Sequence, residues 1–168
     1  MTKKRTFLLT AAIPLLILAA MTIRPEATVV LGKEILLQTK AVDPTDLFRG
    51  DYVSINLAVS EIPESMAPDA LLNLRKKTLY VSLKPAGKFY EVERVSETKP
   101  KEGIYLAGKI RNDVYTPSGT FHVDYSLDKY FVEQGSGKDL QQRSYQAGLI
   151  GRVKVFGGYG VLVGLTPS

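Results

Sequence analysis

The chain opens with a long apolar run, Phe7–Ile23, that contains no charged residue. As an α-helix this run rises about 26 Å, at about 1.5 Å per residue, which is the short end of what spans a bilayer. Lys3-Lys4-Arg5 precede it, and positive charge before a span orients the N-terminus inside. The pattern predicts a membrane anchor over residues 1–25 and an extracytoplasmic β domain over residues 26–168.

A cleaved signal peptide is the alternative interpretation of the same run. Ala19-Ala20-Met21 offers small residues at a cleavage point, but Leu18 fits the pattern before that point poorly. A buried core helix is disfavoured because the segment lacks a polar face. We expect an uncleaved single-pass anchor in the inner (cytoplasmic) membrane, with the N-terminus inside and the C-terminal domain periplasmic or otherwise extracytoplasmic.

The rest of the chain consists of short segments in which apolar and polar residues alternate, as they do in strands with one buried face. Extended segments are predicted over Thr28–Leu31, Glu34–Val42, Tyr52–Val59, Thr78–Leu83, Phe89–Val95, Ile104–Ile110, Thr120–Tyr125, Ala147–Phe156 and Val161–Leu165. Lys84–Lys88 holds both Pro and Gly, so it predicts a hairpin between the segments on either side. We also expect Glu34–Val42 and Tyr52–Val59 to pair antiparallel.

Helical patterns after the anchor are weak. Pro68–Lys77 suits a short helix or a loop, and Asp139–Tyr145 suits a helical turn. Many short strands at near-regular spacing predict a mainly β fold. The expected architecture is a single compact antiparallel β barrel or sandwich with at most one short helix, preceded by an N-terminal transmembrane helix.

A turn-forming cluster leads into the strand predicted after residue 51. Asp43 and Pro44 fix a turn, and Gly50 supplies a position where φ can be positive at no steric cost. These three residues are therefore assigned to a structural turn. The strand that follows carries its apolar residues at every second position, as a half-buried strand requires.

Two blocks of sequence point to a known family. The first is Asp43–Tyr52, and the second is Tyr125–Gly137, an aromatic-flanked strand that ends in an acidic residue and a Gly-rich loop. With the N-terminal apolar run, they make nearly the whole chain resemble the bacterial GDYXXLXY family of membrane-anchored proteins, which has no established biochemical role. The chain departs from the family pattern at Ile55, where Leu is preferred, and at Leu57, where Tyr is preferred. The resemblance implies a multi-pass membrane protein as a possible partner, because members are often encoded beside such proteins.

Both blocks have a structural and a functional interpretation. The structural one is that they fix a turn and fill the core or an edge. The functional one is a recognition patch on one rim, since mixed acidic, basic and Tyr groups are typical of polar recognition. The candidate recognition patch comprises Arg49, Asp51, Tyr52, Lys129, Tyr130 and Glu133. A shared patch requires the two blocks to lie at the same end of the domain.

Charge and composition exclude several function classes. The formal net charge of +5 falls to roughly +2 without the basic residues that precede the apolar run. Basic clusters such as Lys99-Pro100-Lys101 and Lys109-Ile110-Arg111 are interrupted by acids, so no nucleic-acid partner is expected. We interpret them as solvated surface, with weak attraction to anionic lipid headgroups as the alternative. The chain has no cysteine and one histidine, so neither a metal nor a cofactor is expected.

Two enzyme hypotheses remain beside a binding role. His122 and Asp124 share a strand face and could suggest hydrolysis with a serine, although a lone strand histidine is more often structural or exposed. The layout also resembles that of signal peptidases, with Ser54 as nucleophile and Lys84 or Lys129 as base. We expect a non-catalytic accessory or binding module for a membrane partner; a serine/lysine hydrolase and an envelope ligand sensor are the alternatives.

Overall fold

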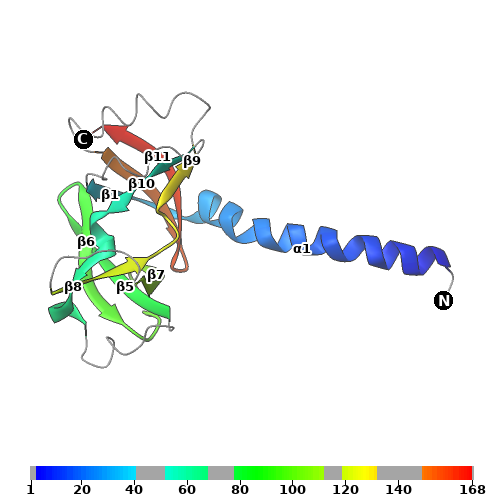
Figure 1. The fold of residues 1–168 in the computed structure, drawn as a ribbon, viewed down its shortest axis with the longest axis horizontal. Helices are drawn as coiled ribbons and strands as arrows, with labels where there is room; N and C mark the ends of the chain where they lie inside the picture. The colour runs from blue at the N-terminus through cyan, green and yellow to red at the C-terminus, as the bar shows by residue number, and fades with distance from the viewer. Residues whose placement is uncertain (1–2, 41–51, 68–77, 112–118, 132–148, 168) are drawn as a thin grey trace.

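A computed structural model describes residues 3–40, 52–67, 78–111, 119–131 and 149–167. One long helix, α1 (Lys3–Leu31), projects from a β domain (Figure 1). The strands are β1 (Lys33–Lys40), β2 (Tyr52–Ser54), β3 (Asn56–Leu57), β4 (Glu61–Pro63), β5 (Thr78–Ala86), β6 (Phe89–Ser96), β7 (Ile104–Arg111), β8 (Thr120–Asp124), β9 (Lys129–Phe131), β10 (Leu149–Phe156) and β11 (Tyr159–Pro167), with 3-10 turns η2 (Ala58–Ser60) and η3 (Glu64–Met66). The predicted mainly β fold with an N-terminal helix is confirmed.

The strands form two curled antiparallel sheets and a small ribbon. One sheet has the order β11-β10-β1-β3, the other has the order β4-β8-β7-β5-β6, and β2 pairs with β9 alone. Strand β1 lies between β10 and β3, so the first strand of the domain pairs with one of the last (Figure 1). Alternate residues point inward and form one core, whose most deeply buried members include Ile35, Leu37, Leu57, Ile62, Leu79, Val81, Leu106, Val123 and Val153.

The predicted hairpin over residues 78–95 is confirmed as β5 and β6, although its turn is shorter than expected. Pairing continues to Ala86 opposite Phe89, and Gly87 supplies the positive φ of 63° that the tight turn needs. The predicted antiparallel pairing of Glu34–Val42 with Tyr52–Val59 is confirmed where Thr39 faces Leu57.

The sequence predicted one continuous strand over Tyr52–Val59, but the structure divides this segment. The chain changes pairing partner at Ile55, whose backbone N–H donates to the carbonyl oxygen of Asp128 over 2.8 Å. Its first half, β2, therefore pairs with β9, while β3 pairs with β1. Alternation still holds through the break, since Ile55, Leu57 and Val59 are all buried.

Thr28–Leu31 is helical, which corrects the extended segment predicted there. The β-branched residues of this stretch suggested a strand, but the last turn of α1 packs against β10 and β11. Thr28 is fully buried, its hydroxyl donates to the carbonyl oxygen of Arg24 over 2.9 Å, and its own carbonyl accepts from the Gly32 N–H over 2.9 Å. Tertiary packing thus decides the conformation against local propensity.

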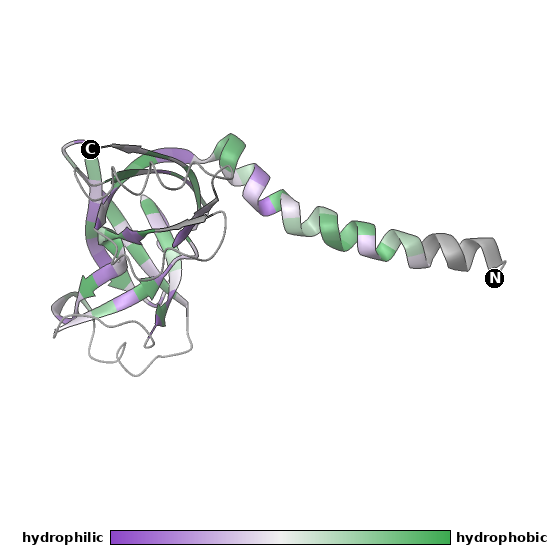
Figure 2. Ribbon diagram, turned by 45° about the horizontal axis from the view of Figure 1, so that its top comes forward, coloured by the Kyte–Doolittle hydropathy of each residue, from purple (hydrophilic) through white to green (hydrophobic). Residues whose placement is uncertain are grey.

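Within α1, Thr10–Leu31 is long and apolar enough to cross a membrane, by length and composition. A signal sequence near an N-terminus has the same properties. Apolar side chains along this helix are open to their surroundings: Leu16 is 67% exposed and Met21 is 70% exposed. Figure 2 shows the hydrophobic helix leading away from the domain, with a short hydrophilic stretch close to it.

The tip of the β10–β11 hairpin ties the two sheets together. The carbonyl oxygen of Gly158 accepts a hydrogen bond from the N–H of Ala107 on β7, over 2.8 Å. Gly158 has a φ of 84°, and a Cβ built on it would lie 2.4 Å from Cε2 of the Tyr105 ring. Only glycine satisfies both constraints at this position.

We predict that Gly158→Ala destabilises the protein by about 2–4 kcal/mol, because left-handed strain of about 1–2 kcal/mol adds to the steric conflict with Tyr105. Gly87→Ala is the matched control: its φ is 63°, and nothing lies within 4 Å of the added Cβ. Gly87→Ala should therefore lose only the stability that corresponds to the left-handed strain. Urea unfolding of the full chain in a neutral detergent measures both. Equal losses would contradict the contact between the hairpin tip and Tyr105.

Candidate functional site

A cavity of about 460 Å³ opens where α1 meets the two sheets, and we call it the junction cleft. Among the described residues, its lining includes three cations, Arg24, Lys99 and Lys109, and one carboxylate, Asp124. Tyrosines and glycine-rich backbone complete the walls: Tyr80, Tyr125, Tyr159, Gly108, Gly157 and Gly158. The cleft is therefore a polar, aromatic site with an excess of positive charge.

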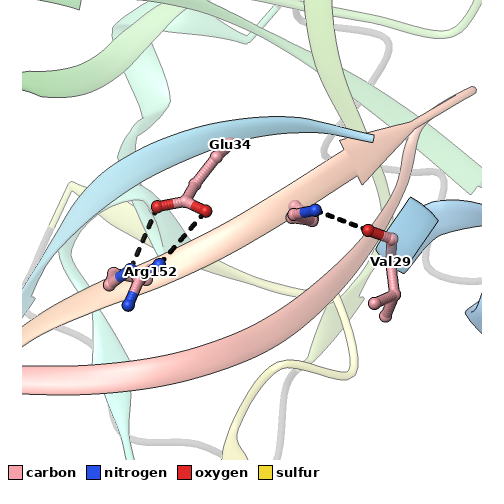
Figure 3. Close-up of polar contacts among 4 residues, drawn as sticks. Val29, Glu34 and Arg152 are labelled. Carbon is pink, nitrogen blue, oxygen red and sulfur yellow. Dashed lines mark hydrogen bonds and ion pairs between the residues drawn. The ribbon is translucent and has the colours of Figure 1, made fainter. Parts of the chain in front are cut away.

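The helix side of the cleft is held by contacts from β10 and β11. The guanidinium of Arg24 lies 4.7 Å from the ring centroid of Tyr159, a cation–π geometry. Lys154 donates from Nζ to the carbonyl oxygen of Val29 over 2.5 Å (Figure 3). Beside it, Arg152 donates from Nε and Nη2 to the Glu34 carboxylate, and this pair holds the pKa of Glu34 below its usual value. The contacts of Tyr159 and Lys154 join α1 to β11 and β10, and the Arg152–Glu34 pair joins β10 to β1.

The carboxylate of Asp124 is already engaged by the protein. Its Oδ1 accepts a hydrogen bond from the Ser126 N–H over 2.6 Å, which supports a positive φ of 59° at Ser126. Its Oδ2 lies 4.0 Å from Nη1 of Arg111. Lys99 and Lys109 are exposed and form no ion pair with any residue that the structure describes. The positive charge of the cleft thus exceeds its negative charge.

Glycine 108 lets the strands approach closely beneath this cleft. A Cβ on Gly108 would lie 2.6 Å from Cγ1 of Val123 and 2.8 Å from Cδ1 of Tyr125. Tyr125 is buried, its hydroxyl donates to the carbonyl oxygen of Val59 over 3.0 Å, and burial raises its pKa. The floor of the cleft is therefore a packed, hydrogen-bonded part of the core.

His122 lies in a polar seam between β4 and β8. In the strand register it faces Glu61, whose carboxylate accepts hydrogen bonds from Lys40 and, over 2.8 Å, from Asn56. Partial burial alone would raise the pKa of Glu61, but these two donors hold it below its usual value. Burial, and then the charge of Arg111, lower the pKa of His122, against the opposing charges of Glu61, Asp124 and Asp128.

The space beside His122 is too small for a substrate. Ser60, His122 and Asp124 border a common space, which is the residue set that a hydrolytic site would require. That space measures about 10 Å³, which is close to the room of one water molecule. The Nδ1 atom of His122 has no hydrogen-bond partner among the described residues. The arrangement favours a structural histidine over a hydrolytic one.

Of the two family blocks, the structure describes Tyr52 from the first and residues 125–131 from the second, and Tyr52 pairs with the end of that segment. In the β2–β9 ribbon Tyr52 faces Phe131, Val53 faces Tyr130 and Ser54 faces Lys129. Lys129 is exposed, while Tyr130 is half-buried and packs against the core, so these neighbours lie on opposite faces. Arg49, Asp51 and Glu133, like the turn residues Asp43, Pro44 and Gly50, fall outside the described residues. The recognition patch stays a prediction.

The strand register places Ser54 opposite a lysine, as the serine/lysine hypothesis requires, but the candidate lysines are not buried. Ser54 does face Lys129 across the ribbon, and Lys84 instead lies on β5 opposite Glu91. A lysine that acts as a base must be desolvated to lose its proton near neutral pH. Lys129 and Lys84 are both exposed. Neither is placed as such a base requires.

Sequence reasoning missed the junction cleft. The basic clusters that contain Lys99 and Lys109 predict a solvated surface and give no sign that they line a cavity. A signal did exist in Arg24, the first charge after the apolar run, because it marks where the helix leaves the apolar environment. What brings these three residues together is the pairing of strands distant in sequence, which no local pattern contains.

We predict that His122 makes stability depend on pH. Because its folded pKa is below the ordinary value of about 6.5, the unfolded chain takes up the proton more readily. The stability that neutral His122 contributes is present above a pH of about 6.5 and is lost as the pH falls below this value. Urea midpoints of the full chain should decline from pH 7.5 to pH 5. His122→Gln should flatten this range, and since the chain has no other histidine, an unchanged slope would contradict the assignment.

Comparison with known proteins assigns the chain to one family. No curated protein and no solved structure matches it. A family model described as GDYXXLXY protein matches residues 14–165, a range that includes the second part of α1, both sheets and the β2–β9 ribbon. The match confirms the resemblance carried by the two blocks. The chain is therefore a member of the GDYXXLXY protein family.

Proposed function

We propose that this protein is a non-catalytic accessory module, anchored by one N-terminal helix in the inner membrane, which presents its β domain to a membrane-protein partner on the extracytoplasmic side. The observation that carries this proposal is the exposed apolar helix and its direct, rigid connection to the sheet. Leu31 ends α1 and Lys33 begins β1, so a single residue, Gly32, separates them.

Burial arguments support the anchor. Apolar side chains of this size gain about 1.5–3 kcal/mol each when removed from water. Ile13, Leu15, Leu16, Ile17, Leu18, Met21 and Ile23 are each more than half exposed on the isolated helix. A lipid environment would cover all of them together, whereas the β domain covers none. The basic residues before the apolar run favour an inside N-terminus.

The short joint supports a partner in the same membrane. A flexible tether would let the domain sample many orientations, but Gly32 and the contacts of Lys154 and Arg24 hold the domain at one angle to the helix. A domain so oriented presents the same surface to any neighbour in the bilayer. The β2–β9 ribbon, in which Tyr52 of the first family block pairs with the second block, is the surface we propose for that contact.

An envelope ligand sensor is the second candidate, and the junction cleft favours it. A cavity of about 460 Å³ is within the usual size of small-ligand sites, about 300–1,000 Å³. Binding there would touch both α1 and the sheets, since Arg24 and Tyr159 line it together. Such a ligand would add to the accessory role and would not require catalysis.

The anchoring is tested by topology. We expect a C-terminal alkaline phosphatase fusion to be active, a C-terminal green fluorescent protein fusion to be dark, and the full-length chain to remain in carbonate-washed membranes. Leu16→Arg should reduce membrane retention, because an arginine at a helix centre costs about 2.5–3.5 kcal/mol on insertion scales. Lys88→Arg, which keeps its charge on the β5–β6 turn, is the control. A shortened, membrane-free product would contradict the uncleaved anchor.

The partner is tested by cross-linking in native membranes. We expect the wild-type chain to give a cross-linked product with an integral membrane protein, and Lys129→Glu to reduce its yield several-fold. Lys84→Glu makes the same charge change on another exposed strand position and should leave the yield unchanged. If no membrane protein is captured, or if both variants behave alike, the ribbon is not the contact surface.

A further inference from the structure

We propose that the junction cleft binds the phosphate group of an anionic headgroup at the membrane surface. This inference rests on the anchoring proposed above, and it assigns a ligand chemistry to a cavity that the family match leaves unassigned. Three side chains supply the positive charge, Arg24 from the helix and Lys99 and Lys109 from the domain.

The charge balance of the cleft favours an anion. The one carboxylate among the described lining residues, Asp124, accepts a hydrogen bond from the Ser126 N–H and lies 4.0 Å from Arg111, which is not among those lining residues. The charges of Lys99 and Lys109 have no carboxylate partner among the residues described. Anionic oxygens would pair with these ammonium groups and with the guanidinium, whose planar fork suits phosphate.

The position of Arg24 sets the height of the cleft relative to a bilayer. The apolar run before it rises about 26 Å, close to the hydrocarbon thickness of about 30 Å, so the first charge after the run lies at the headgroup level. Stacking on Tyr159 holds that guanidinium 4.7 Å from the ring centroid and so keeps it in the cleft. Tyrosine is also typical of this interfacial level.

The shape of the cleft suits a small phosphate ester better than a bare ion. About 460 Å³ exceeds what one phosphate occupies. Tyr80 and Ser126, whose hydroxyls are of the kind that bind a polar glycerol-type group, also line the cleft. Gly157 and Gly158 at the hairpin tip line the cleft with backbone that carries no side chain. The source of the phosphate is either a lipid headgroup or a soluble ester.

Binding is measured by native mass spectrometry of the purified full chain in a neutral detergent, with phosphatidylglycerol as anionic probe and phosphatidylcholine as its zwitterionic counterpart. We expect phosphatidylglycerol to bind more tightly. Lys99→Gln combined with Lys109→Gln should weaken it about thirtyfold, or about 2 kcal/mol at 1.4 kcal/mol per tenfold. Both lysines are exposed, so the double variant should keep the wild-type circular dichroism spectrum and melting temperature.

Lys84→Gln combined with Lys88→Gln is the matched control. It removes the same charge from the β5–β6 hairpin turn and the strand end beside it. This end of β5 is opposite to the end with Thr78 and Tyr80, which line the cleft. Its affinity for phosphatidylglycerol should stay within twofold of wild type. Equal binding of the two lipids, an unaffected cleft variant, or equal losses in both double variants would overturn the proposal.

Two further arms distinguish the source of the phosphate. If millimolar glycerol phosphate or inorganic phosphate displaces the lipid from wild type, the phosphate group alone supplies the affinity and a soluble ester is the ligand. If neither displaces it, the acyl chains contribute and the ligand is a lipid. The lipid-binding measurement uses purified protein in detergent, so it is independent of the topology and cross-linking experiments. A negative lipid-binding result would leave the proposed anchoring intact, and a negative topology or cross-linking result would leave the lipid-binding result interpretable.

Discussion

The one-residue joint at Gly32 is the constraint on which the rest of the structure depends. Its N–H continues the helical hydrogen bonding to Thr28, and a Cβ at this position would lie 2.2 Å from the Thr28 carbonyl oxygen and 3.2 Å from Cβ of Lys154. No larger residue fits without displacing backbone. Helix, joint and β1 therefore form one continuous unit, and the direction of the helix fixes the strand around which the first sheet is assembled.

Because β1 starts at this joint, the domain has to close around its own beginning. Strand β10 pairs along β1 from Lys33, opposite Val155, and carries Lys154 back to the last turn of the helix. The β10–β11 hairpin then reaches the other sheet through Gly158 and Ala107. The junction cleft is the space left where helix, hairpin and second sheet meet. Its existence is a consequence of topology, and its charge is a consequence of which residues face it.

Local patterns in the sequence predicted what local physics decides. Alternation identified the β5–β6 hairpin and the buried face of Ile55 and Leu57, and the apolar run identified the helix. Two errors share one cause: Thr28–Leu31 and Tyr52–Val59 look like ordinary extended segments, yet contacts with distant strands make the first helical and divide the second at Ile55. The cleft could not be predicted for the same reason, because Arg24 and Lys109 line one cavity only once β7 and the helix are packed in the folded domain.

The described polar groups also bear on the binding role proposed for the cleft. A catalytic site needs a titratable group with a shifted pKa that a substrate can reach. In the described part of this chain, His122 has a lowered pKa but borders a space of about 10 Å³. Tyr125, whose pKa is raised by burial, lines the open cleft, but its hydroxyl donates to the carbonyl oxygen of Val59. The cations that line the same cleft are exposed. Cations in an open cleft attract and hold an anion without activating a nucleophile. A held anion at the foot of the helix would in turn bridge Arg24 and the domain, strengthening the same joint that builds the cleft.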